Sequence, residues 1–240
     1  MRNLLCTLAK KIFYGFPSNI IMMFHHINDG KIIKKSRCVF SYNDFIAVLE
    51  SGLEFVAIEN ILTAKQKFKK CAITFDDGLK DLYRVAYPEL KKRNIPFTIF
   101  IVTNFLDTEG YISMKELLEM SRDPLVTIAS HGVSHDILKG MKCEEQKHEL
   151  LYSKQFLEKI INKEVKYFAF SHGQFDECTL KILKESRYYD FAFGVQGYPL
   201  NRMTKKWKYH LPRVNFENGN VRDWVGLLLK SYVEKEGDKR

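Results

Sequence analysis

The stretch Ile73-Thr74-Phe75-Asp76-Asp77-Gly78 joins a short apolar run to two adjacent carboxylates and a glycine. The apolar run begins at Cys71, and it predicts a buried strand over 71–75. Successive strand residues point to opposite sides, so Asp76 and Asp77 are expected to leave the strand end in different directions. Gly78 permits the positive φ that a sharp turn requires at this point.

Adjacent like charges repel, and two interpretations of this acidic pair are open. A divalent metal held by one carboxylate would relieve the repulsion and leave the other free as a base. Alternatively, the acids cap the helix that follows, because Asp is favoured at helix starts.

Strands and helices alternate about seven times along the chain, without a break in composition. Strands are expected at 20–25, 55–58, 71–75, 97–102, 125–129, 167–170 and 190–193, with an extended piece at 211–214. Helices are expected at 42–50, 79–94, 143–161, 176–186 and 224–232. A further short helix is expected to begin at Ser113, which can form a capping box with Glu116. This alternation favours a parallel sheet with right-handed crossovers. No glycine-rich loop follows the first strand, so we predict an α/β fold that closes as a distorted (β/α) barrel of about seven strands.

The composition is that of a globular protein, with 240 residues, 45% hydrophobic and 28% charged. We expect a single domain over 1–240, with a peripheral N-terminal helix over 1–18 and a charged tail over 233–240. The net charge of +9 comes from basic patches at 31–37, 65–70, 205–208 and 230–240. Solvated surface is the favoured interpretation, and contact with a membrane or an anionic lipid carrier is the alternative. No nucleic-acid motif accompanies the charge, so no nucleic-acid partner is expected.

The five cysteines are widely spaced, at Cys6, Cys38, Cys71, Cys143 and Cys178. Their spacing fits neither a zinc knuckle nor a redox motif, so we expect free thiols in a reducing compartment. Residues 1–13 lack the apolar core and cleavage site of a signal peptide. We therefore expect a cytoplasmic protein, with peripheral attachment to a membrane as the alternative.

Polar side chains follow the predicted strands, and in a parallel barrel they would meet at one rim. They are His25 and His26, Asp76 and Asp77, His131 and His135, and Ser171-His172-Gly173.

His131 and His135 are four residues apart, so on one helical turn they would share a face and could bind one metal. Gly132 stands where the H-E-x-x-H motif has its glutamate, so a base must come from elsewhere. Asp77 would supply the third metal ligand, and Asp76 would supply the base. Three protein ligands are typical of catalytic zinc. A helix-capping histidine pair is the alternative interpretation.

Thr74-Phe75-Asp76-Asp77-Gly78 and Ser130-His131-Gly132-Val133-Ser134-His135 together resemble the polysaccharide deacetylase family, the NodB-homology domain of carbohydrate esterase family 4. The resemblance covers nearly the whole chain, because Met23-Phe24-His25, the run from Phe168 to Gly173 and Leu211-Pro212-Arg213-Val214 resemble further family segments. It implies metal-dependent removal of acetyl groups from N-acetylated sugars. Carried over by motif, Asp76 is the general base, and Asp77, His131 and His135 hold a divalent metal. Zinc is favoured, with cobalt or nickel as alternatives.

The third motif departs from the family pattern. Ser171 and His172 replace its usual proline and aromatic residue, and the arginine that orients the base is absent there. We predict that Arg213 replaces this arginine. His210 and His172 compete as the histidine that protonates the leaving amine.

Gly173 and His25 are expected to contact the substrate. The predicted function is removal of N-acetyl groups from an amino sugar of a polysaccharide or a glycan-biosynthesis intermediate. A non-catalytic carbohydrate-binding protein is one alternative. An amidase or deformylase acting on a lipid-linked or small-molecule substrate is the other.

Overall fold

The computed structural model describes residues 19–28, 38–63, 70–197, 200 and 207–215. Parallel strands form one curved sheet in the order β10-β1-β5-β6-β7-β8-β9, with β4 paired to β5. The strands are β1 (Ile20–Phe24), β4 (Glu54–Phe55), β5 (Lys70–Phe75), β6 (Phe97–Ile101), β7 (Val126–Ser130), β8 (Tyr167–Ala169), β9 (Phe191–Phe193) and β10 (Val214–Asn215). A separate parallel pair consists of β2 (His26–Asn28) and β3 (Val39–Ser41). The predicted distorted (β/α) barrel is confirmed.

The segment 211–215 links the two edges of the sheet. Leu211 forms a parallel bridge with Phe193 of β9, and Val214 of β10 pairs with Met22 of β1. The expected extended piece at 211–214 therefore joins both edge strands, although only Val214–Asn215 is regular strand. Arg213 lies at the point where the barrel closes.

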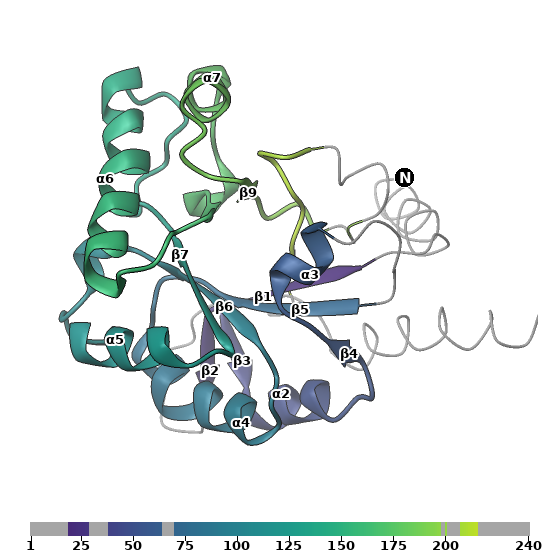
Figure 1. Cartoon of the computed structure of the whole chain (residues 1–240). Coiled ribbons are helices and arrows are strands. Elements are labelled where there is room, and N and C mark those ends of the chain that lie inside the picture. Colours follow the sequence, from purple (N-terminus) through teal and green to yellow (C-terminus); the bar gives the residue numbers. More distant parts are fainter. Residues whose placement is uncertain (1–18, 29–37, 64–69, 198–199, 201–206, 216–240) are drawn as a thin grey trace, which may run out of the picture.

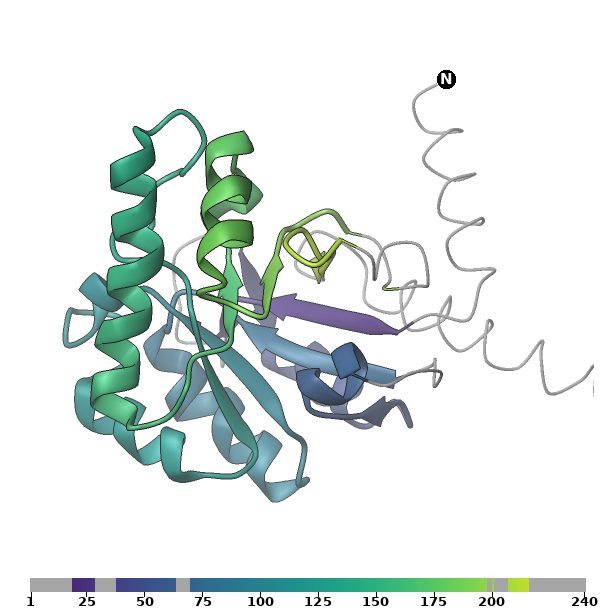
Figure 2. The same cartoon turned by 45° about the horizontal axis from the view of Figure 1, so that its top comes forward.

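Helices cover the outer face of the sheet (Figures 1 and 2). They are α2 (Tyr42–Leu49), α4 (Tyr87–Lys92), α5 (Met114–Arg122), α6 (Cys143–Ile161) and α7 (Glu177–Ser186). The short helix α3 (Ile58–Thr63) instead buries Ile58, Ile61 and Leu62 in the same core cluster as Ala72 of β5. The side chains of Ser41 and Ser113 cap α2 and α5, and Ser113 forms the predicted capping box with Glu116. The turn before α4, Leu82–Ala86, is π-helical. Pro88 follows it and lacks the N–H that a regular helix would use.

Alternation along the strands divides the core into two clusters. Ile73 and Phe75 of β5 belong to the large cluster that also includes side chains of the outer helices. Ala72 of β5 belongs to a smaller cluster with Phe100 and Leu211. Because the side-chain period of a strand is two, the residues that follow Ala72 on its face are Thr74 and Asp76. The pleat therefore directs the first acid of the pair toward the barrel interior.

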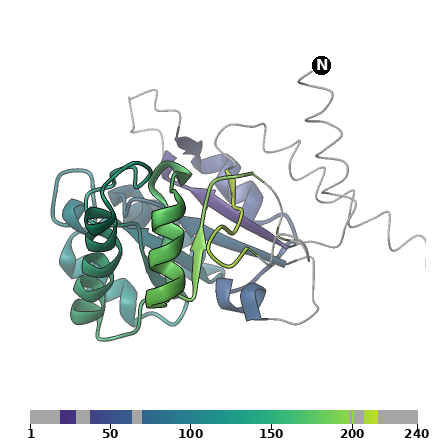
Figure 3. The ribbon, with the colours of Figure 1, turned by 90° about the horizontal axis from the view of Figure 1, so that it is seen from above.

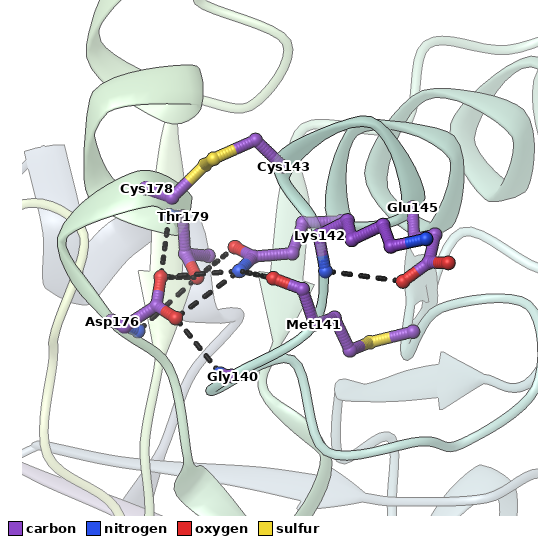
Figure 4. The surroundings of a disulfide bond; sticks show 9 residues. Gly140, Met141, Lys142, Cys143, Glu145, Asp176, Cys178 and Thr179 are labelled. Atoms are coloured by element: carbon purple, nitrogen blue, oxygen red, sulfur yellow. Dashed lines mark hydrogen bonds between the residues drawn. A yellow bond between two sulfur atoms is a disulfide. The ribbon is translucent and has the colours of Figure 1, made fainter.

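Helices α6 and α7 lie side by side on one flank of the barrel in both views (Figures 2 and 3). Their first turns are joined by a disulfide between Cys143 and Cys178, with Cα atoms 5.9 Å apart (Figure 4). The expectation of free thiols is therefore wrong for these two cysteines. The two cysteines are 35 residues apart in sequence, but they lie in the first turns of neighbouring helices, and the sequence pattern did not indicate this proximity. Cys71 is a buried free thiol.

Asp176 lies beside the disulfide and caps α7 (Figure 4). Its carboxylate accepts hydrogen bonds from the backbone N–H of Gly140 (2.9 Å), the backbone N–H of Thr179 (3.2 Å) and the Gln146 amide (3.2 Å). We call these four residues and the disulfide the α6–α7 junction. The backbone donors hold the pKa of Asp176 at about 2.

Several expectations lie outside the described residues. They are the peripheral helix over 1–18, the helix over 224–232, the charged tail over 233–240 and most of the basic patches. Within the described part of the chain, no helix is long and apolar enough to cross a bilayer.

Candidate active site

Asp76 meets Arg213 inside the barrel, as predicted. The Arg213 Nη1 lies 2.5 Å from Asp76 Oδ1 and its Nη2 lies 2.7 Å from Oδ2, so the guanidinium holds the carboxylate with two parallel hydrogen bonds. Both side chains are buried, at 0% and 2% exposure. Arg213 also donates through Nε to the Gly194 carbonyl and stacks over Phe100, 4.9 Å from the ring centre.

The charge of Asp76 depends on these neighbours. Burial alone raises the pKa of a carboxyl group, because the charged form loses its water. For Asp76 the Arg213 guanidinium more than offsets burial, with help from His131 and His25, and the pKa falls to about 2. The carboxylate is therefore ionised and fixed in orientation at neutral pH.

Asp77 leaves the same strand end in the other direction. Its φ of 70° and that of Gly78, 73°, turn the chain sharply, and such values are uncommon outside glycine. The backbone thus separates two adjacent acids into two environments. Whereas Asp76 is paired, the buried Asp77 Oδ1 atom has no hydrogen-bond partner among the described residues.

The histidine pair lies on a loop, residues 131–135, and the expected helical turn is wrong. Gly132 has φ 88° and His135 has φ 68°, values that a right-handed helix excludes. The two rings still approach to 5.0 Å between centres. Spacing by four residues predicted the proximity correctly, but a turn with positive φ produces it.

Three donor atoms converge at this rim. His131 Nε2 lies 3.5 Å from Asp77 Oδ1, and His135 Nε2 lies 3.3 Å from the same oxygen. The other ring nitrogen of His131 is 2.8 Å from the Ala169 carbonyl, which fixes the tautomer that leaves Nε2 as an acceptor. All three residues offer ligand atoms within 4.8 Å of one another.

This cluster fits a divalent metal ion. An unpartnered buried carboxylate oxygen is costly, and a cation would satisfy it. Zinc bonds of roughly 2.1 Å in tetrahedral geometry place ligand atoms about 3.4 Å apart, close to both distances from Asp77 Oδ1. Burial, and then His131, lower the pKa of His135, so its ring favours the neutral form that ligates metals.

The predicted proton donor His172 and the predicted substrate-contacting residue Gly173 lie near this rim. His172 has φ 55°, and its exposed ring lies 4.8 Å from that of His135. Gly173, with φ 67°, approaches Val195 so closely that an added Cβ would lie 2.4 Å from a Val195 methyl group. His25 follows β1, and its charge contributes to the low pKa of Asp76.

His210 has different surroundings. Among the described residues, its ring packs against Phe175 (4.6 Å between centres) and Trp207 (6.0 Å), and it contacts the Gln196 amide. Burial lowers its pKa. Of the two histidines predicted as proton donors, the structure brings only His172 into ring contact with the His131–His135 pair.

Glu149 of α6 is a residue of this site that sequence reasoning missed. Its carboxylate contacts the histidine loop through Val133 and Ser134. A signal was present, because Glu149 falls in the buried stripe of α6 between Gln146 and Ser153. A charged residue in the apolar register of an amphipathic helix needs partners in the protein.

Comparison with known proteins agrees with this geometry. The sequence model of the polysaccharide deacetylase family matches residues 63–190, more than half of the chain. The Staphylococcus aureus poly-β-1,6-N-acetyl-D-glucosamine N-deacetylase is 27% identical over 238 residues, which cover 85% of this chain and 81% of that protein. YxkH of Bacillus subtilis is 26% identical over 216 residues, with 88% and 76% covered.

Solved structures show the same fold. The Streptococcus pyogenes deacetylase PplD superposes with a TM-score of 0.76 at 22% identity, over 88% of this chain and 98% of that one. IcaB from Ammonifex degensii gives 0.75 at 18% identity, over 89% and 97%. The matched region contains the paired acids and the histidine loop, and this chain belongs to the polysaccharide deacetylase family.

Proposed function

We propose that the protein is a metal-dependent hydrolase that removes N-acetyl groups from an amino sugar of a glycan. The observation that carries this proposal is the pair of environments at residues 76 and 77. One carboxylate is held ionised by Arg213, and the other faces two imidazole nitrogens with a buried, unpartnered oxygen. Amide hydrolysis assisted by a metal requires both a base and a ligand set of this kind.

Asp77, His131 and His135 would hold the metal. A divalent ion at such a site lowers the pKa of a bound water to roughly 7 and polarises a carbonyl group. Zinc is the ion we propose first, with cobalt or nickel as alternatives, because imidazole and carboxylate ligands suit all three.

Asp76 would take the proton of the attacking water. A pKa of about 2 makes it a weak base, so it would hold the proton only transiently. Its bidentate pairing with Arg213 fixes the carboxylate plane, so turnover relies on orientation more than on basicity. We propose His172 as the first donor to test for the leaving amine, because its ring adjoins that of His135.

The favoured substrate class is an N-acetylated polysaccharide. The Staphylococcus aureus relative is named for poly-β-1,6-N-acetyl-D-glucosamine, which is therefore the first polymer to test. Gly173 and His25 would contact the sugar beside the reacting amide. Contact with a membrane or anionic lipid carrier through the basic patches is a further proposal, tested by sedimentation with anionic vesicles.

A non-catalytic carbohydrate-binding role is the alternative, and the altered third motif is its motivation. The replacement of the missing arginine by Arg213 counts against it, because the base keeps its bidentate partner.

The disulfide between Cys143 and Cys178 counts against the expected cytoplasmic location, since disulfides persist in oxidising compartments. Cell fractionation with thiol labelling under non-reducing conditions tests the location.

The experiment for the main proposal is acetate release. The purified chain, stripped with a chelator, is assayed on N-acetylated polymers, oligosaccharides and lipid-linked sugars, before and after zinc is restored. We expect release from at least one polymeric substrate only after metal is added. Formate release from a formylated small molecule, with no acetate from any glycan, would instead support the deformylase alternative.

A further inference from the structure

The loop of residues 131–135 is held against the barrel by a carboxylate from α6. We propose that Glu149 is a positioning residue for metal binding, which keeps this loop in the conformation that presents both histidines. The inference rests on the proposed metal site.

Glu149 is 6% exposed, and its carboxylate contacts three hydrogen-bonding groups of the loop. Its Oε2 accepts from the backbone N–H of Val133 at 2.6 Å and of Ser134 at 3.2 Å. Its Oε1 lies 2.8 Å from the Ser134 hydroxyl, which is also 2.6 Å from the exposed Asp136. These two N–H groups lie between the two histidines in sequence, so their acceptor helps to determine how the loop turns.

The loop is shaped to admit this carboxylate. A Cβ on Gly132 would lie 2.8 Å from Glu149 Oε2, closer than real Cβ contacts come, and the φ of 88° also disfavours any other residue. His135 itself adopts φ 68°, which costs energy for a residue with a Cβ. Such a conformation persists only where its surroundings impose it. Between Gly132 and His135, Glu149 accepts from two backbone N–H groups, and the Val133 carbonyl accepts from the Asn104 N–H at 3.0 Å.

A second anchor fixes the start of the loop independently. The Ser130 hydroxyl donates to Ser153 Oγ at 2.8 Å and accepts from the Gly132 N–H at 3.2 Å. His131 is further held by the Ala169 carbonyl. Glu149 is therefore the side chain that holds the later part of the loop, together with the backbone hydrogen bond from Asn104, whereas His131 keeps its own contacts.

The matched control lies on the same helix. Glu158 also accepts a backbone N–H, that of Val165 at 2.9 Å, and it pairs with Lys154. It lies nine residues farther along α6, about 14 Å at the rise of an α-helix. Glu158→Gln thus alters a similar carboxylate without touching the histidine loop.

The experiment measures zinc affinity and folding together in the full chain. The zinc Kd is determined by competition with a chromophoric chelator at 20 °C, and circular dichroism and melting temperature are recorded for each variant. Glu149→Ala should weaken zinc binding by roughly 10- to 100-fold, the usual effect of removing a group that orients a ligand. Glu149→Gln should restore most of the affinity, because an amide oxygen still accepts from the two N–H groups. Glu158→Gln should leave the Kd unchanged.

A purely structural role for Glu149 would lower the melting temperature but leave the Kd of the folded protein unchanged. A folded Glu149→Ala protein with the wild-type Kd therefore overturns the inference alone. Should that variant fail to fold, Ser134→Ala removes one of the three donors, and an unchanged Kd in this variant overturns the inference. Wild-type protein that binds no zinc would overturn the proposed metal site and, with it, this inference.

Discussion

Asp77 at the barrel rim and Asp176 at the α6–α7 junction are both loop carboxylates, and their surroundings are opposite. Asp176 receives donors from Gly140, Thr179 and Gln146, beside a covalent link between two helices. Asp77 Oδ1 receives no hydrogen bond from the part of the chain that the structure describes, and it faces two imidazole nitrogens. A carboxylate with its lone pairs filled by backbone donors stabilises structure. A buried carboxylate without donors costs stability and marks a place for a ligand.

The contrast predicts that changes at the rim alter chemistry and changes at the junction alter stability. The largest expected effect comes from the donor set. The double variant His131→Ala, His135→Ala should lose bound metal and all measurable deacetylation while it stays folded, because only one ligand remains. Metal analysis of the purified protein tests this directly. His148→Ala, on the exposed side of α6, is the matched control. Full metal occupancy in the double variant would contradict the proposed site.

The second prediction distinguishes the role of Asp76 as base from the role of Asp77 as metal ligand. Asp76→Asn should keep its metal but lose roughly two to four powers of ten in turnover, the usual contribution of a general base. Asp77→Asn should lose metal instead. Parallel measurement of zinc content and kcat in the two variants tests the division. Loss of metal from Asp76→Asn would mean that the two acids share the ligand role.

The third prediction concerns Arg213, whose guanidinium is fully buried. Arg213→Lys should be nearly as damaging as Arg213→Ala, because an ammonium group cannot reproduce two parallel hydrogen bonds. Arg213→Ala leaves a buried charge without its partner, so it should cost about 3–5 kcal/mol of unfolding free energy. Misorientation of the base should reduce turnover by up to about a hundredfold. Urea unfolding and kcat measure the two effects, and an Arg213→Lys protein with wild-type turnover would refute the positioning role.

The smallest expected effect lies at the junction. The pKa of Asp176 is about 2 in the folded protein, held there by backbone donors, against roughly 3.9 when unfolded. The charged form is thus favoured by folding. Its stabilisation is fully present above about pH 5 and is lost as the pH falls toward 2. The difference in melting temperature between wild type and Asp176→Asn should therefore be constant from pH 7 to 5 and shrink below pH 4.

Kinetics at neutral pH provide the control for that comparison, since Asp176→Asn should leave kcat and the zinc Kd unchanged. A difference in melting temperature that persists undiminished at pH 2 would show that the charge of Asp176 is not its source.

The local sequence pattern was sufficient to predict much of the secondary structure of this protein. The apolar run before Asp76, the length of α6 and the capping box at Ser113 were all predicted from sequence, and the structure confirms them. These features depend on side chains within a few residues of one another. The contact between Asp76 and Arg213 was also predicted, because parallel strands of one barrel bring their carboxyl ends to the same rim.

Tertiary packing determined the conformation of the histidine loop and the pairing of two cysteines, which residue spacing did not predict correctly. The histidines were expected on a helical turn, but contacts from Glu149, eighteen positions after His131 in sequence, accompany a turn with positive φ. Cys143 and Cys178 were expected as free thiols, and the adjacency of α6 and α7 joins them. Sequence alone determined which chemical groups this protein possesses and that they gather at one rim, since residue type and strand order are written along the chain. Only the folded structure decided how Asp77 is presented, with one oxygen facing two imidazole nitrogens, because that depends on the positive φ at Asp77 and on the path of the loop that carries His131 and His135.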